Sequence, residues 1–341
     1  MKILITGGSG FVGSNIAIYL KKNFKKSKIS SLDNLMRRGS LINKNRLKKY
    51  NIKNYNINIE KFDKIKSLPK FDIIIDCCAE PAIEASRKNP DRVFKTNLVG
   101  TFNILKKCVK DNAHIIFLSS SRVYSINKLR KLTKNLNLLK PLKISKKVDE
   151  KFETSSASSL YGFTKLASEK LIKEIFFTTN LKYIINRFGV IAGPWQFGKQ
   201  DQGFVPLWVA KHLFKKRLSY IGFGGHGHQV RDIIHIEDVC KIILLQIKKL
   251  KKINNDTFNI GGGSKNSISL KNLTSKCEKI TKNKIKIKKV SRTSIFDIPY
   301  FVTDNSKIQK IYKWKPSKNI EAILKDIYNW LTENKNIRNY F

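Results

Sequence analysis

The stretch MKILITGGSGFVGSNIAIYL, residues 1–20, decides the fold. A short apolar run is followed by three glycines at equal spacing and then by an apolar-periodic segment. This order of strand, glycine-rich turn and helix is the context that a dinucleotide-binding fingerprint requires. Gly7 would form the tight turn, Gly10 would let the backbone approach a pyrophosphate, and Gly13 would let the helix pack on the strand.

An acidic residue completes this fingerprint. Asp33 ends the second expected strand, where a carboxylate can accept hydrogen bonds from both ribose hydroxyls of a dinucleotide. A carboxylate at that place repels a 2′-phosphate, so the sequence favours NAD over NADP. Arg37 and Arg38 follow closely and would soften that preference.

Hydrophobic periodicity alternates between strand and helix through the first half of the chain. Strands are expected over residues 3–5, 28–33, 71–79, 114–121 and 181–193. Helices are expected over residues 15–24, 97–109 and 160–177. This βαβ alternation predicts an α/β fold with a doubly wound parallel sheet of the Rossmann type.

The chain is expected to divide into two lobes. Residues 1–187 would form the NAD-binding domain, with 229–260 returning to it. Residues 188–228 and 261–341, which are richer in glycine, proline and aromatic residues, would form a smaller substrate-binding lobe. The basic segment 126–156 lacks a clear period, and we interpret it as an insertion or flap beside the site.

The composition is strongly basic, with a formal net charge of +43 over 341 residues. The lysines are spread over the whole chain and accompany abundant asparagine and isoleucine. We therefore favour a solvated surface that attracts anionic metabolites over a specific nucleic-acid site. No apolar run approaches the roughly 18 residues of a membrane span, and the first residues do not resemble a signal peptide. A cytoplasmic location is expected.

Two clusters raise the question of a metal. Cys77 and Cys78 are adjacent within an apolar run, which favours a buried strand in a reducing compartment. His226 and His228 lie in a glycine-rich turn, but no cysteine or acidic cluster stands beside them to complete a ligand shell. The sequence predicts no metal site.

Two segments carry catalytic side chains. Tyr161 and Lys165 lie four residues apart in the helix expected over 160–177, so they share one face. An ammonium group and a nicotinamide cation would both stabilise a phenolate, which lets the tyrosine act as a base. The end of the strand expected over 114–121 presents three consecutive serines, whose hydroxyls can orient a substrate oxygen.

These motifs resemble the extended short-chain dehydrogenases/reductases of the NAD-dependent sugar-nucleotide epimerase/dehydratase family. TGGSGFVG is similar to that family's cofactor turn, and Tyr161 with Lys165 is similar to its catalytic pair. The resemblance places Asn97 in a structural and cofactor-supporting role, and it places Ser120 at the catalytic serine position with Ser121 as the alternative. The cofactor contacts that it implies also include Phe11, Val12, Asn34, Asn58 and Ala79.

Within the family, the resemblance is strongest to the group of CDP-paratose 2-epimerases, through segments such as DNLMRRGS and QFGKQDQGFVPLW. It implies that Arg231 and Arg292 bind the phosphates of a nucleotide sugar and that Ser121 and Gln202 contact the substrate. An ion pair with Asp232 or Glu237 is the alternative for Arg231. Asn58 stands where the family usually has an aspartate near the adenine.

The resemblance leaves several chemistries to choose between. Dehydratases of the family carry an Asp-Glu pair directly after the catalytic Ser/Thr, and here those places hold Ser121 and Arg122. Epimerisation needs no such acid and base, so we expect an NAD-dependent epimerase acting on a nucleotide sugar, with CDP favoured, as in O-antigen biosynthesis. A homodimer or homotetramer is expected. The alternatives are another modifying enzyme of the family, such as a 4-epimerase, dehydratase or reductase, and a non-catalytic NAD- or nucleic-acid-binding relative.

Overall fold

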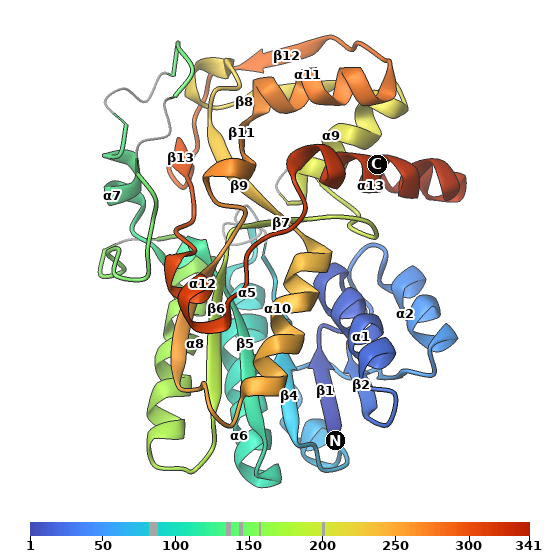
Figure 1. Cartoon of the computed structure of the whole chain (residues 1–341), viewed down its shortest axis with the longest axis vertical. Helices are drawn as coiled ribbons and strands as arrows, with labels where there is room; N and C mark the ends of the chain where they lie inside the picture. The colour runs from blue at the N-terminus through green and yellow to red at the C-terminus, as the bar shows by residue number, and fades with distance from the viewer. Residues whose placement is uncertain (82–87, 134–137, 143–145, 157, 200–201) are drawn as a thin grey trace. The chain divides into compact units, whose positions relative to one another are not determined.

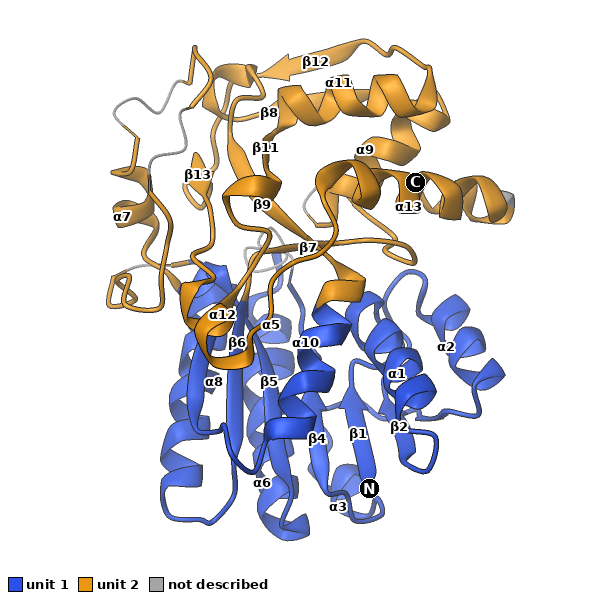
Figure 2. Cartoon of the chain, in the orientation of Figure 1, with its two compact units in different colours: residues 1–123, 159–187, 239–258 blue, residues 124–158, 188–238, 259–341 orange. Residues whose placement is uncertain are grey.

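The computed structural model describes residues 1–341 apart from 82–87, 134–137, 143–145, 157 and 200–201. The chain forms two compact units (Figure 2). Unit 1 comprises residues 1–123, 159–187 and 239–258, and unit 2 comprises residues 124–158, 188–238 and 259–341.

Unit 1 is built on a sheet that, in the described residues, has seven strands in the order β10-β6-β5-β4-β1-β2-β3 (Figure 1). Its strands are β1 (Lys2–Thr6), β2 (Lys28–Leu32), β3 (Lys53–Tyr55), β4 (Ile73–Asp76), β5 (His114–Ser120), β6 (Tyr183–Phe188) and β10 (Asp256–Ile260). The pairs β1–β2, β2–β3, β1–β4 and β4–β5 are parallel. The strand order reverses direction at β1, so the predicted doubly wound sheet is confirmed.

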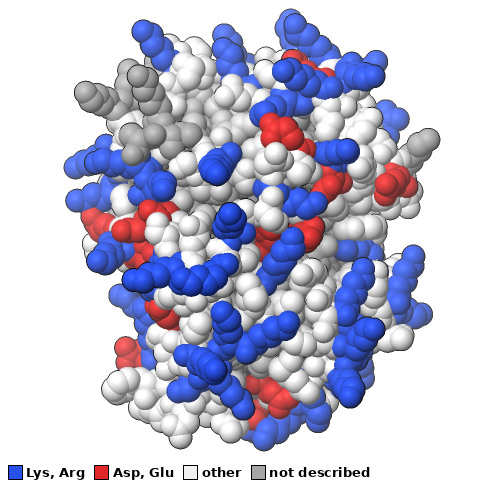
Figure 3. Space-filling model, in the orientation of Figure 1, with Lys and Arg blue, Asp and Glu red and all other residues white. Residues whose placement is uncertain are grey.

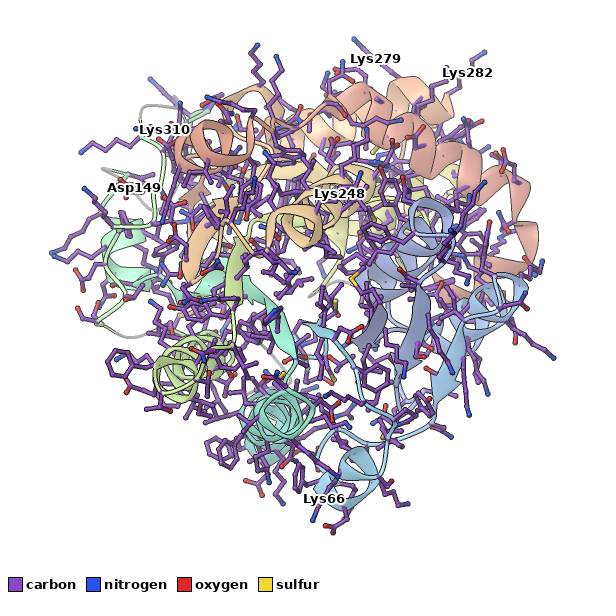
Figure 4. The ribbon with its side chains drawn as sticks, turned by 60° about the horizontal axis from the view of Figure 1, so that its bottom comes forward. Lys66, Asp149, Lys248, Lys279, Lys282 and Lys310 are labelled. Carbon is purple, nitrogen blue, oxygen red and sulfur yellow. The ribbon has the colours of Figure 1, made fainter. Side chains whose placement is uncertain are left out.

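Helices cover both faces of this sheet (Figure 4). They are α1 (Phe11–Asn23), α2 (Ser40–Lys49), α3 (Phe62–Lys66), α5 (Pro90–Phe94), η1 (Lys95–Val99), α6 (Gly100–Asp111), η2 (Ser121–Val123), α8 (Leu160–Phe177) and α10 (Ile236–Lys249). In Figure 4, α1 and α10 lie on one side of the strands and α6 and α8 on the other. Because both faces are covered, the central strands are almost entirely apolar: Leu4, Ile74 and Ile115 are fully buried in one cluster.

Unit 2 combines short strands with amphipathic helices. Its strands are β7 (Val190–Ala192), β8 (Leu218–Ile221), β9 (Val230–His235), β11 (Ser267–Ser269), β12 (Ile287–Val290) and β13 (Tyr300–Phe301). Its helices are α7 (Ile126–Arg130), α9 (Phe204–Leu213), η3 (Phe223–Gly225), η4 (Ser264–Asn266), α11 (Leu270–Thr281), α12 (Ser306–Tyr312), α13 (Ile320–Glu333) and η5 (Lys335–Tyr340). Strand β9 is the centre of one sheet, because it pairs with β7, β11 and β13.

The compact units differ from the expected division at three places, one of which is that the returning segment ends at Phe258 and not at residue 260. Strand β9 packs with unit 2 through its pairing with β7, so the chain returns to unit 1 at Val239 and not at residue 229. The segment 124–158 also belongs to unit 2. The functions expected of the two lobes stay predictions.

The described parts of the basic segment 126–156 belong to unit 2, and residues 134–137 and 143–145 lie outside the described residues. Val148 pairs with the chain around Thr303: its N–H donates to the carbonyl oxygen of Val302 at 2.8 Å, and its own carbonyl accepts from Asp304 at 2.9 Å. The Tyr300 hydroxyl donates to the Lys146 carbonyl at 2.6 Å. These bonds hold residues 146–148, and their partners are distant in sequence, so hydrophobic periodicity does not reveal them.

Several element boundaries differ from expectation. The strand expected over 71–79 is shorter: β4 ends at Asp76, so Cys77 and Cys78 follow the strand and do not lie in it. The first helix begins at Phe11, four residues before the expected start, because the glycine turn leads directly into it. The single strand expected over 181–193 is two strands, β6 and β7, separated by Gly189. The Gly189 N–H donates to the Ile260 carbonyl at 2.9 Å, and β7 then leaves the large sheet to pair with β9.

Lysine and arginine side chains are scattered over the face seen in Figure 3 and form no single stripe there. The exposed Lys66, Lys279 and Lys282 extend away from the ribbon in Figure 4. Of the helices that the structure describes, none has the length and apolar character needed to cross a bilayer.

Candidate functional site

The carboxyl ends of the parallel strands of unit 1 bring several of the expected residues to one edge of the sheet. Gly7 directly follows β1 and Asp33 directly follows β2, while Ser120 is the last residue of β5. Ala79 lies three residues beyond β4. Asn58 lies three residues beyond β3. Because neighbouring strands here are parallel, these positions share an edge, which is where open α/β sheets bind ligands.

The glycine turn is closely packed against its own backbone. Gly7 has a φ of 59°, in the left-handed region that favours glycine. A Cβ on Gly13 would lie 2.4 Å from the Gly7 carbonyl oxygen and 2.8 Å from the Gly8 Cα, so α1 can start this close to β1 only without a side chain there. At Gly10 a Cβ would meet only the Gly7 carbonyl oxygen, at 3.0 Å.

Helix α1 begins with an N-terminus suited to an anion. Gly10 is its N-cap and offers no side chain to its N–H groups, and no acidic residue lies in its first turn. The first N–H groups of a helix have no intrahelical acceptor and carry the positive end of the helix dipole. Phe11 and Val12 form that turn, so their N–H groups can hold a phosphate.

Asp33 is fixed beside this turn. Its Oδ2 accepts from the Ser9 N–H at 3.1 Å, and its Oδ1 accepts from the Leu35 N–H at 2.8 Å. Burial raises the pKa of Asp33, and these two N–H groups oppose that rise by stabilising the carboxylate. The Asn34 side chain forms a hydrogen bond within the same loop: its Oδ1 accepts from the Met36 N–H at 3.2 Å.

Asn97 ties the loop after β4 to α8. Its Oδ1 accepts from the Glu80 N–H at 2.7 Å, and its Nδ2 donates to the Glu80 carbonyl and to Thr164 Oγ1, each at 3.2 Å. It lies in η1, a single wide π-helical turn of the kind often found at functional sites. Asn97 thus holds the loop that contains Ala79. Asn58, by contrast, closes a turn, with its Oδ1 accepting from the Glu60 N–H at 3.0 Å.

Helix α8 presents the expected catalytic pair. Its N-cap, Ser159, accepts from the Gly162 N–H at 3.1 Å, so the helix begins directly before Tyr161. Lys165 is 2% exposed and donates to the Leu118 carbonyl of β5 at 2.9 Å. Tyr161, one turn earlier on the same face, is 9% exposed. The ammonium group is therefore held between α8 and the end of β5.

The three consecutive serines have different surroundings. Ser119 is 5% exposed and its hydroxyl donates to Glu169 Oε1 at 2.5 Å, so it faces the interior. Ser120 is half-buried, and its Oγ accepts from the Arg122 N–H at 3.1 Å. Ser121 is also half-buried and begins η2. Ser120 and Ser121 thus both stay candidates for the hydroxyl that orients a substrate.

The structure shows a buried ion pair that the sequence analysis missed, one helical turn beyond Lys165 on α8. Glu169, one turn beyond Lys165 on α8, pairs with Arg187 of β6, with NH2 to Oε2 at 2.6 Å and Nε to Oε1 at 3.0 Å. Together with Ser119 it joins α8 to two neighbouring strands. The signal for it was the spacing of Tyr161, Lys165 and Glu169, which places all three on one helix face.

Unit 2 contains three of the four residues expected to contact the substrate, and the fourth, Ser121, belongs to unit 1. Arg231 of β9 is half-buried, and its guanidinium donates to the carbonyl oxygens of Val230 at 2.8 Å and Ile298 at 2.6 Å. Arg292 is exposed on the segment between β12 and β13. Gln202 exchanges two backbone hydrogen bonds with Lys199, at 2.7 and 3.2 Å.

The basic segment anchors the loop that carries Arg292. Arg130 of α7 donates from Nε to the Asp297 carbonyl at 3.0 Å and from NH2 to the Ser294 carbonyl at 2.9 Å. These two bonds fix the stretch that begins two residues after Arg292, which the sequence analysis did not foresee.

The two clusters considered for a metal have other surroundings. His226 and His228 lie with ring centroids 6.5 Å apart, and burial lowers the pKa of His228. Burial raises the pKa of both the Cys77 and the Cys78 thiol. Across the described residues, no group of three or more His, Cys, Asp or Glu side chains could hold a metal ion.

The sequence and the fold were compared with those of known proteins. A model of the NAD dependent epimerase/dehydratase family matches residues 3–261. The chain is 28% identical over 339 residues to the CDP-paratose 2-epimerase of Salmonella typhi, covering 97% of this chain and 99% of that protein. It is 31% identical over 265 residues to the dTDP-D-glucose 4,6-dehydratase of Dictyostelium discoideum, covering 76% of this chain and 58% of that protein.

Among solved structures, the UDP-glucose 4-epimerase of Thermotoga maritima with UDP-glucose matches with a TM-score of 0.82 and 26% identity. The match covers 98% of this chain and 100% of that chain.

Proposed function

Because this chain belongs to the NAD dependent epimerase/dehydratase family, an extended short-chain dehydrogenase/reductase group, we propose that it is a nucleotide-sugar epimerase related to the CDP-paratose 2-epimerases. The observation that carries the proposal is the pairing of a buried Tyr161 and Lys165 on α8 with a serine-rich strand end that no Asp-Glu pair follows. The chain is an enzyme, and its cofactor is NAD.

The residues of unit 1 fit this cofactor. The glycine turn leaves no room for a Cβ at Gly13, and the N-terminus of α1 has no side-chain cap, so both features suit a pyrophosphate. The fixed carboxylate of Asp33 suits a ribose diol. The residues that would hold it are Gly7, Gly10, Phe11, Val12, Gly13, Asp33, Asn34, Asn58, Ala79, Asn97, Tyr161 and Lys165. When bound, NAD supplies a hydride acceptor that later returns the hydride to the sugar.

The chain's own catalytic task is proton transfer and orientation. Tyr161 takes the proton from the hydroxyl of the carbon that is oxidised and returns it after the sugar has presented its other face. Lys165 stabilises the phenolate electrostatically and binds ribose hydroxyls. Ser120 holds the oxygen of the keto-sugar, with Ser121 as the alternative.

Dehydration is the less favoured chemistry. An elimination needs one group to protonate the leaving hydroxyl and another to remove an α-proton. The two positions after Ser120 hold Ser121 and Arg122, and neither supplies a carboxyl group. A UDP-sugar 4-epimerase is the second candidate function, favoured by the likeness to the Thermotoga maritima enzyme.

The nucleotide sugar is proposed to be a CDP-sugar, with Arg231 and Arg292 contacting its phosphates and Ser121 and Gln202 contacting it elsewhere. The full-length likeness to the Salmonella typhi enzyme supports this choice. Arg292 is exposed, and its guanidinium is suited to bind an anionic ligand. A role in O-antigen biosynthesis and a cytoplasmic location stay predictions.

We further propose a homo-oligomer, a dimer or a tetramer. Helices α6 and α8 pack against each other and expose Phe102, Phe163 and Phe177, the last of them 87% exposed. Large exposed apolar side chains on neighbouring helices favour burial against a second copy. The net charge is proposed to attract anionic metabolites and no specific nucleic acid, which the scatter of basic residues in Figure 3 supports.

One experiment tests the assignment. The protein with NAD is incubated with a panel of CDP-, UDP-, GDP- and dTDP-sugars, and products are identified by NMR. We expect a C2 epimer of a CDP-sugar and no net change in NAD. A C4 epimer of a UDP-sugar would replace the first proposal with the second, and a 4-keto-6-deoxy product would identify a dehydratase.

A further inference from the structure

We propose that Glu80 is a specificity-determining residue for the cofactor: by holding Arg37 in an ion pair, it keeps that cation from binding a 2′-phosphate. The site would then select NAD through two acids, Asp33 and Glu80, and not through Asp33 alone. This inference rests on the proposed role of Asp33.

Glu80 forms ion pairs with two arginines at once. Its Oε1 lies 3.1 Å from NH1 of Arg37, and its Oε2 lies 3.1 Å from NH2 of Arg92. The Glu80 side chain is 11% exposed, whereas those of Arg37 and Arg92 are 34% and 45% exposed. Because the Glu80 carboxylate is the most buried of the three groups, its position is the most restricted, and it fixes the positions of the two arginine side chains.

The backbone of Glu80 is fixed independently of these ion pairs. Its N–H and its carbonyl oxygen are both bound by the Asn97 side chain, at 2.7 and 3.2 Å. The backbone position of Glu80 therefore does not depend on its two ion pairs. Arg37 approaches it from the loop after β2, four residues beyond Asp33.

Arg37 lies within electrostatic reach of the ribose-binding acid as well. Its charge lowers the pKa of Asp33, in opposition to the rise that burial causes. A guanidinium this close to the expected ribose is what a 2′-phosphate would require, because arginine binds phosphate oxygens in a bidentate way. Pairing with Glu80 engages this guanidinium, so a 2′-phosphate would have to displace a carboxylate in order to bind it.

Glu80→Gln tests the proposal, since it removes the charge and keeps the shape. Calorimetry measures the Kd of NAD and of NADP for the wild type and the variant, without substrate. We expect the affinity for NADP relative to NAD to rise about fivefold, the size of one partly exposed ion pair. The matched control is Asp91→Asn, which removes the same charge from exposed α5 and should leave the ratio unchanged.

The double variant Glu80→Gln with Arg37→Gln should not show the roughly fivefold rise in relative NADP affinity, because the Arg37 guanidinium that Glu80→Gln releases is then absent. In the otherwise unchanged chain, Arg37→Gln should alter NADP affinity less than about twofold, since the Arg37 guanidinium is already engaged by Glu80. This single variant keeps the proposal testable if Glu80→Gln fails to fold.

Three results would overturn the inference: an unchanged ratio in Glu80→Gln, a gain that persists without Arg37, or a large loss of NADP binding in the single Arg37→Gln variant. Failure of the wild type to bind NAD would contradict the proposed cofactor site itself. The experiment therefore distinguishes a failure of the Glu80 proposal from a failure of the proposed cofactor site.

Discussion

Gly13→Ala tests the packing of the glycine turn most severely. The added methyl group would lie 2.4 Å from the Gly7 carbonyl oxygen, 2.8 Å from the Gly8 Cα and 2.9 Å from the Gly7 carbonyl carbon. All three atoms belong to the backbone, so no side chain can rotate away. Since non-bonded heavy atoms prefer about 3.5–4.0 Å, helix α1 would have to move by about 1 Å.

The expected cost follows from two opposing effects. Forcing an extra methyl group into a packed place costs about 1–3 kcal/mol. Alanine gains up to about 1 kcal/mol over glycine in a helix interior, and less in a first turn such as this one. We therefore expect a net loss of about 2 kcal/mol in the free energy of unfolding, measured by urea unfolding followed by circular dichroism.

Gly10→Ala is the matched comparison. Its methyl group would meet only the Gly7 carbonyl oxygen, at 3.0 Å, and alanine is a poorer N-cap than glycine. The free energy of unfolding should therefore fall by about 1 kcal/mol, less than in Gly13→Ala. Because Gly10 is proposed to let the backbone approach the pyrophosphate, NAD affinity should fall about tenfold, measured by calorimetry. Gly13→Ala with wild-type stability would refute the packing argument. Gly10→Ala with wild-type NAD affinity would refute the assigned role of that glycine.

Three further predictions concern single side chains. Tyr161→Phe should keep NAD binding and lose turnover by about 10²–10⁴-fold, as measured in initial-rate assays; full activity would exclude it as the base. Glu169→Gln should leave Arg187 buried without its charge partner and lower the free energy of unfolding by about 3–5 kcal/mol, whereas an unchanged urea midpoint would contradict that pairing. Burial lowers the pKa of His212 below its unfolded value of 6.5, so the unfolded state binds more protons and stability falls as pH drops below about 6.5. The urea midpoint should therefore fall between pH 7.5 and 5.5, and less so in His212→Gln; an equal fall in both would exclude His212 as a cause.

Local patterns in the sequence were sufficient for five strands of the large sheet and for the ends of some elements, but they did not predict β3 or β10. The helix expected over 160–177 has those bounds in the structure, because Ser159 caps it and an apolar stripe continues to its end. The order of strand, glycine turn and helix also placed the first helix, although its start was expected four residues late. Alternating periodicity is a local property, and so it could be read directly.

Contacts between distant residues were not predictable in this way. The bond from Ser119 to Glu169 and the pair of Glu169 with Arg187 join residues 50 and 18 positions apart. The Glu80–Arg37 pair spans 43 positions and depends on how β2 and β4 lie in the sheet. The anchoring of 126–156 was missed for the same reason, because Val148 finds its partners at 302–304.

The fate of the hydrogen on the oxidised carbon tests the proposed epimerase chemistry most directly. A nucleotide sugar deuterated at that carbon is converted in ordinary water with the wild-type protein and NAD, and the product is analysed by NMR. The account predicts an epimer that keeps the deuterium, because the hydride leaves and returns within one active site while Tyr161 moves only the hydroxyl proton. Loss of the label to solvent, or steady accumulation of free NADH, would contradict it.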